Sequence, residues 1–201
     1  MYELAFSIFH MDSTNIVNAT SAVILNISPD HLDRYDTMED YISAKARLYQ
    51  MTQLAVVNRD DAVAQAQCPT DIKSVSFGLS APDVTGDFGI LPTDAGYALV
   101  ELRQDGMFAW FATQNLLLSG RHHWANVLSA LALCSPFGLS SEVVSRVLSR
   151  FSGLAHRTQR VAEKQGALWV NDSKGTNLGA TLSAVSYTHL RAYETIALIS
   201  Y

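Results

Sequence analysis

Short apolar runs alternate with amphipathic stretches in the first half of the chain. Ala22–Ile27 is continuously apolar and rich in β-branched residues before Ser28–Asp30, and Leu54–Asn58 repeats this pattern before Arg59–Asp61. Such runs are typical of strands buried on both faces of a parallel sheet. Between them, apolar residues at helical spacing predict a helix over Met38–Gln50. The order strand, helix, strand predicts an α/β fold.

The pattern changes between Ser74 and Leu118. Two stretches of strand character, Tyr97–Arg103 and Met107–Ala112, flank a turn that contains Asp105 and Gly106. An Asp-Gly pair supplies the positive φ angles of a tight hairpin. We therefore predict that Ser74–Leu118 is an antiparallel β insertion in the parallel sheet.

Two helices are predicted after this insertion. The first covers about His123–Ser135 and ends at Pro136, and the second begins at Ser140 or Ser141 and reaches Phe151. Proline and glycine after an apolar periodic segment are common helix stops. Residues 1–150 are accordingly predicted to form one domain.

A second α/β pattern begins after this point. Ala167–Val170 is predicted to be a strand, Asn171–Thr176 a polar turn, and Asn177 the start of a helix. Residues 151–184 are therefore predicted to begin a second, Rossmann-like domain. Val185–Thr195 resembles the translation of a sequencing-library adapter, and helical amphipathicity stops at Ala184. We treat residues 185–201 as non-native and use them for no functional argument.

Composition and charge narrow the classes of function. Of the 201 residues, 48% are hydrophobic and 16% charged, which excludes a disordered chain. The net charge of −5 gives no basic footprint, so we expect no nucleic-acid partner and no docking to anionic membranes. No apolar run reaches the ~18 residues of a membrane span, and we expect a cytoplasmic protein. Cys68 and Cys134 form neither a zinc motif nor a disulfide scaffold, and we expect two buried thiols.

Lys45 stands out in the Met38–Gln50 helix because it falls within the apolar stripe. A lysine in this place extends its amine outward to water, binds an anion, loses its proton or is chemically modified. A neutral amine could react with carbon dioxide and give a carbamate that binds a metal. Periodicity alone does not choose between these interpretations.

His31 follows the Ala22–Ile27 strand directly, where open α/β sheets bind their ligands. Its imidazole could hold a divalent cation, or its ring N–H could simply donate a hydrogen bond to a neighbouring aspartate, Asp30 or Asp33, in a turn.

His122 and Asn126 are four residues apart on a predicted helix, next to Gly120. Asparagine can bind an adenine edge through two hydrogen bonds, although a helix cap with a solvated polar face fits the same spacing. In the turn Asn171–Asn177, backbone N–H groups and Lys174 could hold an anion while Asp172 accepts ribose hydroxyls. The chain contains no GxxxxGK[ST] phosphate loop, so an ATP-using protein would carry that loop upstream of residue 1.

Several of these stretches together resemble the Mur ligase family. The resemblance covers about residues 5–184. The matching segments, in chain order, are Leu25–Tyr35, Tyr41–Tyr49, Val56–Asp61, Val75–Gly78, Leu118–Asn126, Phe151–Arg157 and Asn171–Asn177. It implies part of a central ATPase domain followed by the start of a Rossmann-like C-terminal domain.

The resemblance implies an ATP-dependent ligase of peptidoglycan synthesis that works with Mg²⁺. The last two segments favour the branch that adds D-glutamate to UDP-N-acetylmuramoyl-L-alanine through an acyl phosphate. We expect these two small molecules as substrates, a monomer, and no turnover by this chain alone. Two alternatives stay open: another Mur ligase or a folylpolyglutamate synthetase-like ligase, and a degenerate nucleotide-binding protein.

The resemblance also implies roles for single residues. His31 and carbamylated Lys45 would bind the metal, Asn126 and His122 would lie at the adenine, and Asp172 would hold the ribose. Arg157 would stabilise the transferring phosphoryl group, and Lys174 and Thr176 would serve the substrate side. The predicted catalytic residues are therefore Lys45, Arg157 and Lys174.

The sequence departs from the family pattern at two positions. Ala5 stands where the family carries a magnesium-binding glutamate, and Glu3, two residues away, is too distant along a strand to replace it. His123 stands where the family usually has asparagine.

Overall fold

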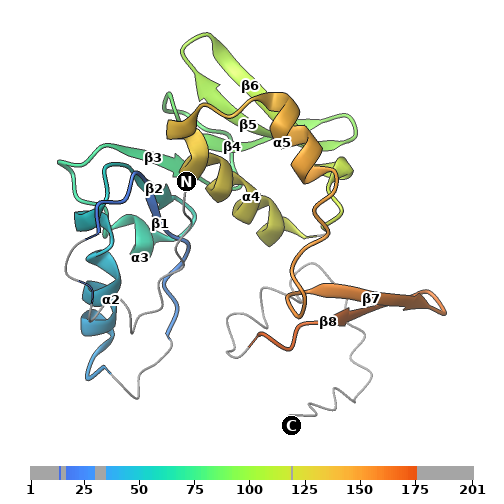
Figure 1. Cartoon of the computed structure of the whole chain (residues 1–201), viewed down its shortest axis with the longest axis horizontal. Helices are drawn as coiled ribbons and strands as arrows, with labels where there is room; N and C mark the ends of the chain where they lie inside the picture. The colour runs from blue at the N-terminus through green and yellow to red at the C-terminus, as the bar shows by residue number, and fades with distance from the viewer. Residues whose placement is uncertain (1–13, 15–16, 30–34, 119, 176–201) are drawn as a thin grey trace. The chain divides into compact units, whose positions relative to one another are not determined.

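The computed structural model describes residues 14, 17–29, 35–118 and 120–175 (Figure 1). Its internal contacts divide the chain into two units, Met1–Ser152 and Gly153–Tyr201. Each unit is described here by itself. The predicted adapter-derived tail and the predicted helix from Asn177 lie outside the described residues.

Within the described residues, six strands of the first unit form one sheet whose spatial order follows the chain (Figure 1). The first three strands are parallel to one another, and Val56 pairs with Val23 on one side and with Val75 on the other. The parallel strands and the helices between them confirm the predicted α/β class. The strands are β1 (Ala22–Ile24), β2 (Ala55–Asn58), β3 (Ser74–Phe77), β4 (Phe88–Thr93), β5 (Gly96–Arg103) and β6 (Gly106–Ala112).

The antiparallel part of the sheet is smaller than predicted. β4, β5 and β6 are antiparallel, and Gly106 has a φ of 119° in the predicted Asp-Gly turn. The prediction is wrong for β3, which is parallel to β2, and β4 joins β3 through a parallel Phe77–Phe88 pair. The chain crosses back through α3 (Ala62–Gln65) before β3, so β3 enters the sheet in the direction of β2.

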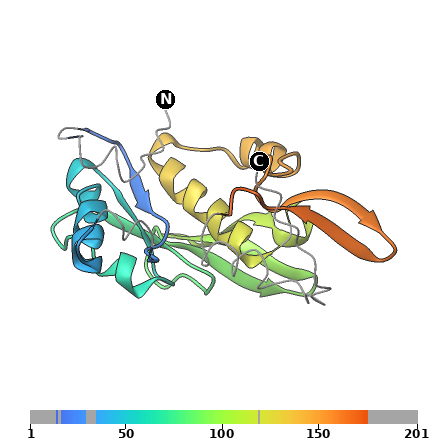
Figure 2. The ribbon, with the colours of Figure 1, turned by 90° about the horizontal axis from the view of Figure 1, so that it is seen from below.

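The two faces of β2 belong to two hydrophobic clusters. Val56 joins the cluster that includes Leu128 of α4 (Arg121–Cys134), and Ala55 and Val57 join the cluster on the side of α2 (Met38–Ala46) and α3. Because side chains alternate along a strand, the continuous apolar run serves both faces of the sheet. Figure 2 shows α4 on one side of the sheet and α2 with α3 on the other. Leu128 is fully buried, which is worth roughly 1.5–3 kcal/mol of transfer free energy.

α2 and α5 (Ser141–Leu148) begin where expected but end early, α4 begins at Arg121 instead of His123, and α3 was not predicted. α2 stops at Ala46 and is followed by a 3₁₀ turn over Tyr49–Met51, because Tyr49 enters the core and bonds to Val56. α5 is capped by Ser140 and ends before the predicted Phe151. No helix among the described residues has the length and apolar content needed to cross a membrane.

The second unit contains an antiparallel hairpin of β7 (Gln159–Lys164) and β8 (Ala167–Asn171). The strand predicted at Ala167–Val170 is confirmed, whereas β7 was not predicted. Five of the six β7 residues are exposed, so β7 lacks the apolar signal of a buried strand. Gln165 and Gly166 both have positive φ, as a tight hairpin turn requires.

The cysteines differ from the predicted buried thiols. Cys68 and Cys134 are not joined by a disulfide, and both are only partly buried. Partial burial raises the pKa of the Cys68 thiol above its ordinary value.

Candidate functional site

The loops that follow β1 and β2 are tied together at one edge of the sheet. The Asn58 side-chain amide donates to the Leu25 carbonyl at 2.7 Å, and the Ile27 amide donates to the Asp61 carboxylate at 2.8 Å. Parallel strands place their carboxyl ends at the same edge, which is where α/β sheets bind ligands. This edge is the candidate site of the first unit.

Lys45 reaches this edge from α2. The helix buries Tyr41 and Ala44, and Thr37 caps its start by accepting a hydrogen bond from the Asp40 amide. The half-buried Lys45 Nζ donates to the Asn26 carbonyl at 3.3 Å and lies 4.7 Å from the centre of the Tyr41 ring. Its amine is therefore held just beyond the carboxyl end of β1.

The predicted partner of Lys45 lies outside the described residues. His31 falls in the range 30–34, and Thr176 and Ala5 also lie outside. Over the ranges that the structure describes, no three His, Cys, Asp or Glu side chains gather as metal ligands. The metal site at Lys45 and His31 stays a prediction.

The start of α4 lies at the same edge of the sheet. Gly120 precedes the helix with a φ of 112°, and the first turn has no side-chain cap. His122 is half-buried and Asn126 is exposed on this helix, while His123 is 9% exposed with its ring centre 4.0 Å from that of His122. His123, at the position where the sequence departs from the family pattern, is therefore a buried residue.

Two loops of the second unit bring Arg157, Asp172 and Lys174 near one another. The Asp172 carboxylate accepts a hydrogen bond from the Thr158 amide at 2.8 Å, and the Lys174 amide donates to the His156 carbonyl at 3.0 Å. The Arg157 and Lys174 side chains are exposed. Three of the predicted residues are thus carried by adjoining backbone segments.

The backbone on both sides of Arg157 is unusual. His156 has a φ of 67° and Thr158 a φ of 46°, which non-glycine residues rarely adopt. Such strain, roughly 1–3 kcal/mol for each residue, persists only where neighbouring contacts hold it. Here the contacts include the Asp172 and Lys174 bonds and a 3.1 Å contact between the Asn171 amide and the His156 ring.

Sequence reasoning missed Arg59 and the buried Asp87 near the same sheet edge. Asp87 is 7% exposed, and its carboxylate accepts from the Ser76 amide at 2.5 Å and from the Ser76 hydroxyl at 2.6 Å. Arg59 donates to the Ser76 hydroxyl at 3.2 Å. The signal in the sequence was the charged triplet Arg59–Asp61, which directly follows β2.

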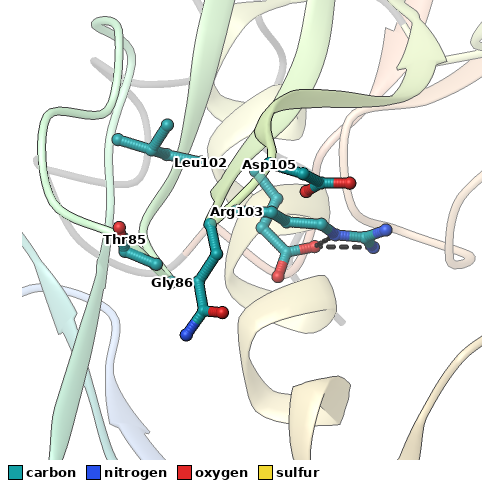
Figure 3. A pocket seen from close by; sticks show the side chains of 7 residues that line it. Thr85, Gly86, Leu102, Arg103 and Asp105 are labelled. Atoms are coloured by element: carbon teal, nitrogen blue, oxygen red, sulfur yellow. Dashed lines mark hydrogen bonds and ion pairs between the residues drawn. The ribbon is translucent and has the colours of Figure 1, made fainter.

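Two hollows on the surface have linings that contain none of the predicted site residues. One of about 440 Å³ is lined by residues of the β5–β6 hairpin and of the segment before β4, and in Figure 3 its Arg103 is directed to the Glu101 carboxylate. Another of about 270 Å³ is lined by Thr20, Lys73 and Pro136 among others. Thr20 and Lys73 precede β1 and β3, so this hollow lies at the opposite edge of the sheet.

Comparison with known proteins identifies relatives of this chain. A family model described as the Mur ligase middle domain matches residues 5–134. The UDP-N-acetylmuramoylalanine–D-glutamate ligase of Legionella pneumophila (strain Paris) is 41% identical over 188 residues, covering 92% of this chain and 41% of that protein. The ligase of the same name from Nitrosomonas europaea is 38% identical over 190 residues, covering 92% and 40%. The chain thus spans about two fifths of the length of these relatives.

Solved structures give the same fold. A UDP-N-acetylmuramoyl-L-alanyl-D-glutamate–2,6-diaminopimelate ligase superposes with a TM-score of 0.53 at 29% identity, covering 72% of this chain and 31% of that one. MurF from Acinetobacter baumannii superposes with a TM-score of 0.61 at 19% identity, covering 83% and 36%. The second likeness supports the fold alone.

Proposed function

Because the chain belongs to the Mur ligase middle-domain family, we propose that it is part of an ATP-dependent ligase that adds D-glutamate to UDP-N-acetylmuramoyl-L-alanine. The observation that carries this proposal is the 41% identity over 92% of the chain to a relative named for that reaction. Within the longer protein, residues 1–150 would belong to the ATP-binding domain and residues 151–184 would begin the C-terminal domain.

The proposed reaction has two steps. A carboxylate oxygen of the muramoyl-alanine substrate attacks the γ-phosphorus of ATP, ADP leaves, and an acyl phosphate forms. The amine of D-glutamate then attacks the acyl carbon, the amide bond forms, and phosphate leaves with the bond electrons while the amine loses a proton. No covalent bond to the protein is required.

The first unit would supply the metal and adenine contacts. A neutral Lys45 amine would form a bond to the carbon of carbon dioxide and release a proton, which leaves a carbamate. The contacts of Nζ with the Asn26 carbonyl and the Tyr41 ring hold this amine beyond the carboxyl end of β1, where the proposed metal site lies. Carbamylated Lys45 and His31 would hold Mg²⁺, which neutralises phosphate charge when bound. Asn126 and His122 would contact the adenine.

The second unit would supply groups for the ribose, the phosphoryl group and the substrate. Because Thr158 uses one Asp172 oxygen, the second oxygen remains for a ribose hydroxyl. Arg157 would stabilise the phosphoryl group in transfer, and Lys174 and Thr176 would serve the muramoyl or glutamate carboxylates. The hydrogen bonds between the two loops support a shared role for Arg157 and Asp172.

The test is a phosphate-release assay of the full-length protein with ATP and UDP-N-acetylmuramoyl-L-alanine. Release that depends on D-glutamate, together with the product mass, would support the proposal. Release that depends instead on diaminopimelate would indicate another Mur ligase, and nucleotide binding without an amide product would indicate a degenerate protein.

A matched pair of variants tests the role of Lys45. Lys45→Ala should lower kcat by at least about 100-fold if the carbamate positions the metal. Lys73→Ala, which removes an exposed lysine at the opposite edge of the sheet, should leave kcat unchanged. Equal rates for the two variants would rule out the metal-binding role of Lys45.

A further inference from the structure

Arg59, directly after β2, makes side-chain hydrogen bonds to three later parts of the chain. Nη1 donates to the Phe88 carbonyl at 2.7 Å and to the Ser76 hydroxyl at 3.2 Å. Nη2 donates to the Ser80 carbonyl at 2.7 Å, and Nε donates to the Ser80 hydroxyl at 3.3 Å. One side chain thus joins the ends of β2 and β3 to the start of β4.

Most of the Arg59 hydrogen bonds go to residues 78–80, which follow β3 and are here called the β3 turn. Asp60, next to Arg59, binds the same turn by accepting from the Leu79 amide at 2.6 Å. A Cβ at Gly89 would lie 2.2 Å from the Ser80 carbonyl oxygen, and one at Gly78 would lie 2.7 Å from Arg59 Cγ. Glycines therefore allow the turn and the guanidinium to approach this closely.

The β3 turn also contacts Arg121, the first residue of α4. Arg121 Nη2 donates to the Leu79 carbonyl at 3.3 Å. The Arg121 guanidinium also lies 5.8 Å from the ring centres of both Tyr97 and Trp124, which are 5.4 Å from each other. Among the described residues no side chain caps α4 at Gly120, so the Leu79 carbonyl and the Tyr97 ring are the contacts outside the helix that hold its first residue.

We propose that Arg59 is a positioning residue for the nucleotide: by holding the β3 turn, it fixes the start of α4 and so orients Asn126 and His122. This inference rests on the proposed function, in which these two residues contact adenine. Arg59 itself touches no substrate in this scheme. Its effect passes through the Leu79 carbonyl and Arg121.

The chemistry of the turn explains why this residue is an arginine. The acceptors lie around one planar group, and the guanidinium has five N–H donors in a fixed fork. A lysine ammonium can reach one or two of these oxygens but cannot bind the Phe88 and Ser80 carbonyls in the same geometry. Lysine should therefore restore the function only in part.

The experiment measures steady-state kinetics and the affinity for a non-hydrolysable ATP analogue in the full-length protein. Arg59→Met should raise the KM for ATP and weaken analogue binding by about five- to tenfold, the equivalent of one weakened hydrogen bond. The KM for D-glutamate should change less than about twofold. Arg59→Lys should fall between Arg59→Met and the wild type.

Arg103→Met is the matched control, because Arg103 is also a partly buried, bonded arginine in the same sheet. It pairs with Glu101 at 2.8 Å and stacks on the Phe108 ring at 3.5 Å, and its bonded partner lies outside the β3 turn (Figure 3). It should leave the affinity for the ATP analogue unchanged. Equal losses in Arg103→Met and Arg59→Met would reduce Arg59 to a general stabilising role and overturn the inference.

A double-mutant cycle tests whether the effect of Arg59 on nucleotide affinity passes through Arg121. If Arg59 acts through Arg121, the losses of analogue affinity in Arg59→Met and Arg121→Met should not add in the double variant. Additive losses would overturn this route, as would an unchanged affinity in Arg59→Met. If Arg59→Met does not fold, the KM for ATP and the affinity for the ATP analogue are measured in Arg59→Lys and Asp60→Asn instead.

The outcome is separable from that of the proposed function. A wild type that binds the analogue but forms no amide would refute the ligase proposal and leave the positioning of α4 measurable by affinity. A fully active wild type with an unaffected Arg59→Met variant would refute the inference alone. A wild type that binds no nucleotide would refute both.

Discussion

Tyr49 links α2 to the parallel strands through a fully buried hydroxyl, and its removal gives a sharp test of the fold. The hydroxyl donates to the Val56 carbonyl at 2.9 Å and accepts from the Ile24 amide at 3.4 Å. Burial is the largest influence on this phenol, and it raises the pKa of Tyr49 from 10.0 to about 12. Tyr49→Phe removes both the hydrogen bonds and the titration.

Of these two effects, only the titration depends on pH. Near neutral pH, the loss of the hydroxyl should lower the free energy of unfolding by about 1–2 kcal/mol, since the Val56 carbonyl loses a buried partner. A group whose pKa is raised by folding stabilises the folded state fully below its unfolded pKa and loses that contribution as pH rises through the folded value. The wild type should therefore lose about 1.4 kcal/mol between neutral pH and about pH 11, whereas the variant lacks this loss.

The assay is urea unfolding of the wild type and of Tyr49→Phe at about pH 8 and about pH 11. The difference in unfolding free energy should favour the wild type at the lower pH and fall close to zero at the higher pH. A difference that stays constant, or grows with pH, would refute the assignment of a buried phenol whose pKa is raised by desolvation.

Two further substitutions test the packing around the site. Gly89→Ala should lower the free energy of unfolding by about 1–3 kcal/mol in urea denaturation, because the added methyl would meet the Ser80 carbonyl at 2.2 Å. An unchanged free energy of unfolding would contradict the close approach. Thr37→Ala should cost about 1 kcal/mol by removing the cap of α2, measured by thermal unfolding, and Thr37→Ser should restore it; failure of serine to do so would mean that the hydroxyl is not the stabilising group.

Local chemistry was enough to predict the elements that depend on neighbouring residues. The Asp105–Gly106 turn, the start of α5 at Ser140 and the end of α4 before Pro136 were all predicted from single residues with defined backbone preferences. The apolar runs likewise predicted buried strands at β1 and β2. β1 is shorter than its apolar run because pairing with β2 ends at Ile24.

Features that depend on distant residues were not predicted. The direction of β3 is set by its partner β2, and nothing in Ser74–Phe77 itself distinguishes parallel from antiparallel pairing. Arg59 bonds to the Phe88 carbonyl across 29 positions of sequence, so its role is visible only after folding. For the candidate site, spacing brought His122 and Asn126 together on one helix, but the bonds between the Arg157 and Asp172 loops required coordinates.

The six strands lie side by side in the sheet in the order in which they are synthesised. Among these described strands, each one after β1 therefore pairs with the strand that precedes it in the chain. Synthesis from the N-terminus favours this arrangement, because each new strand closes only a short loop and covers the exposed edge of the strand before it. Nascent chains halted after β4 or after β5 should accordingly already hold the three parallel strands in native register.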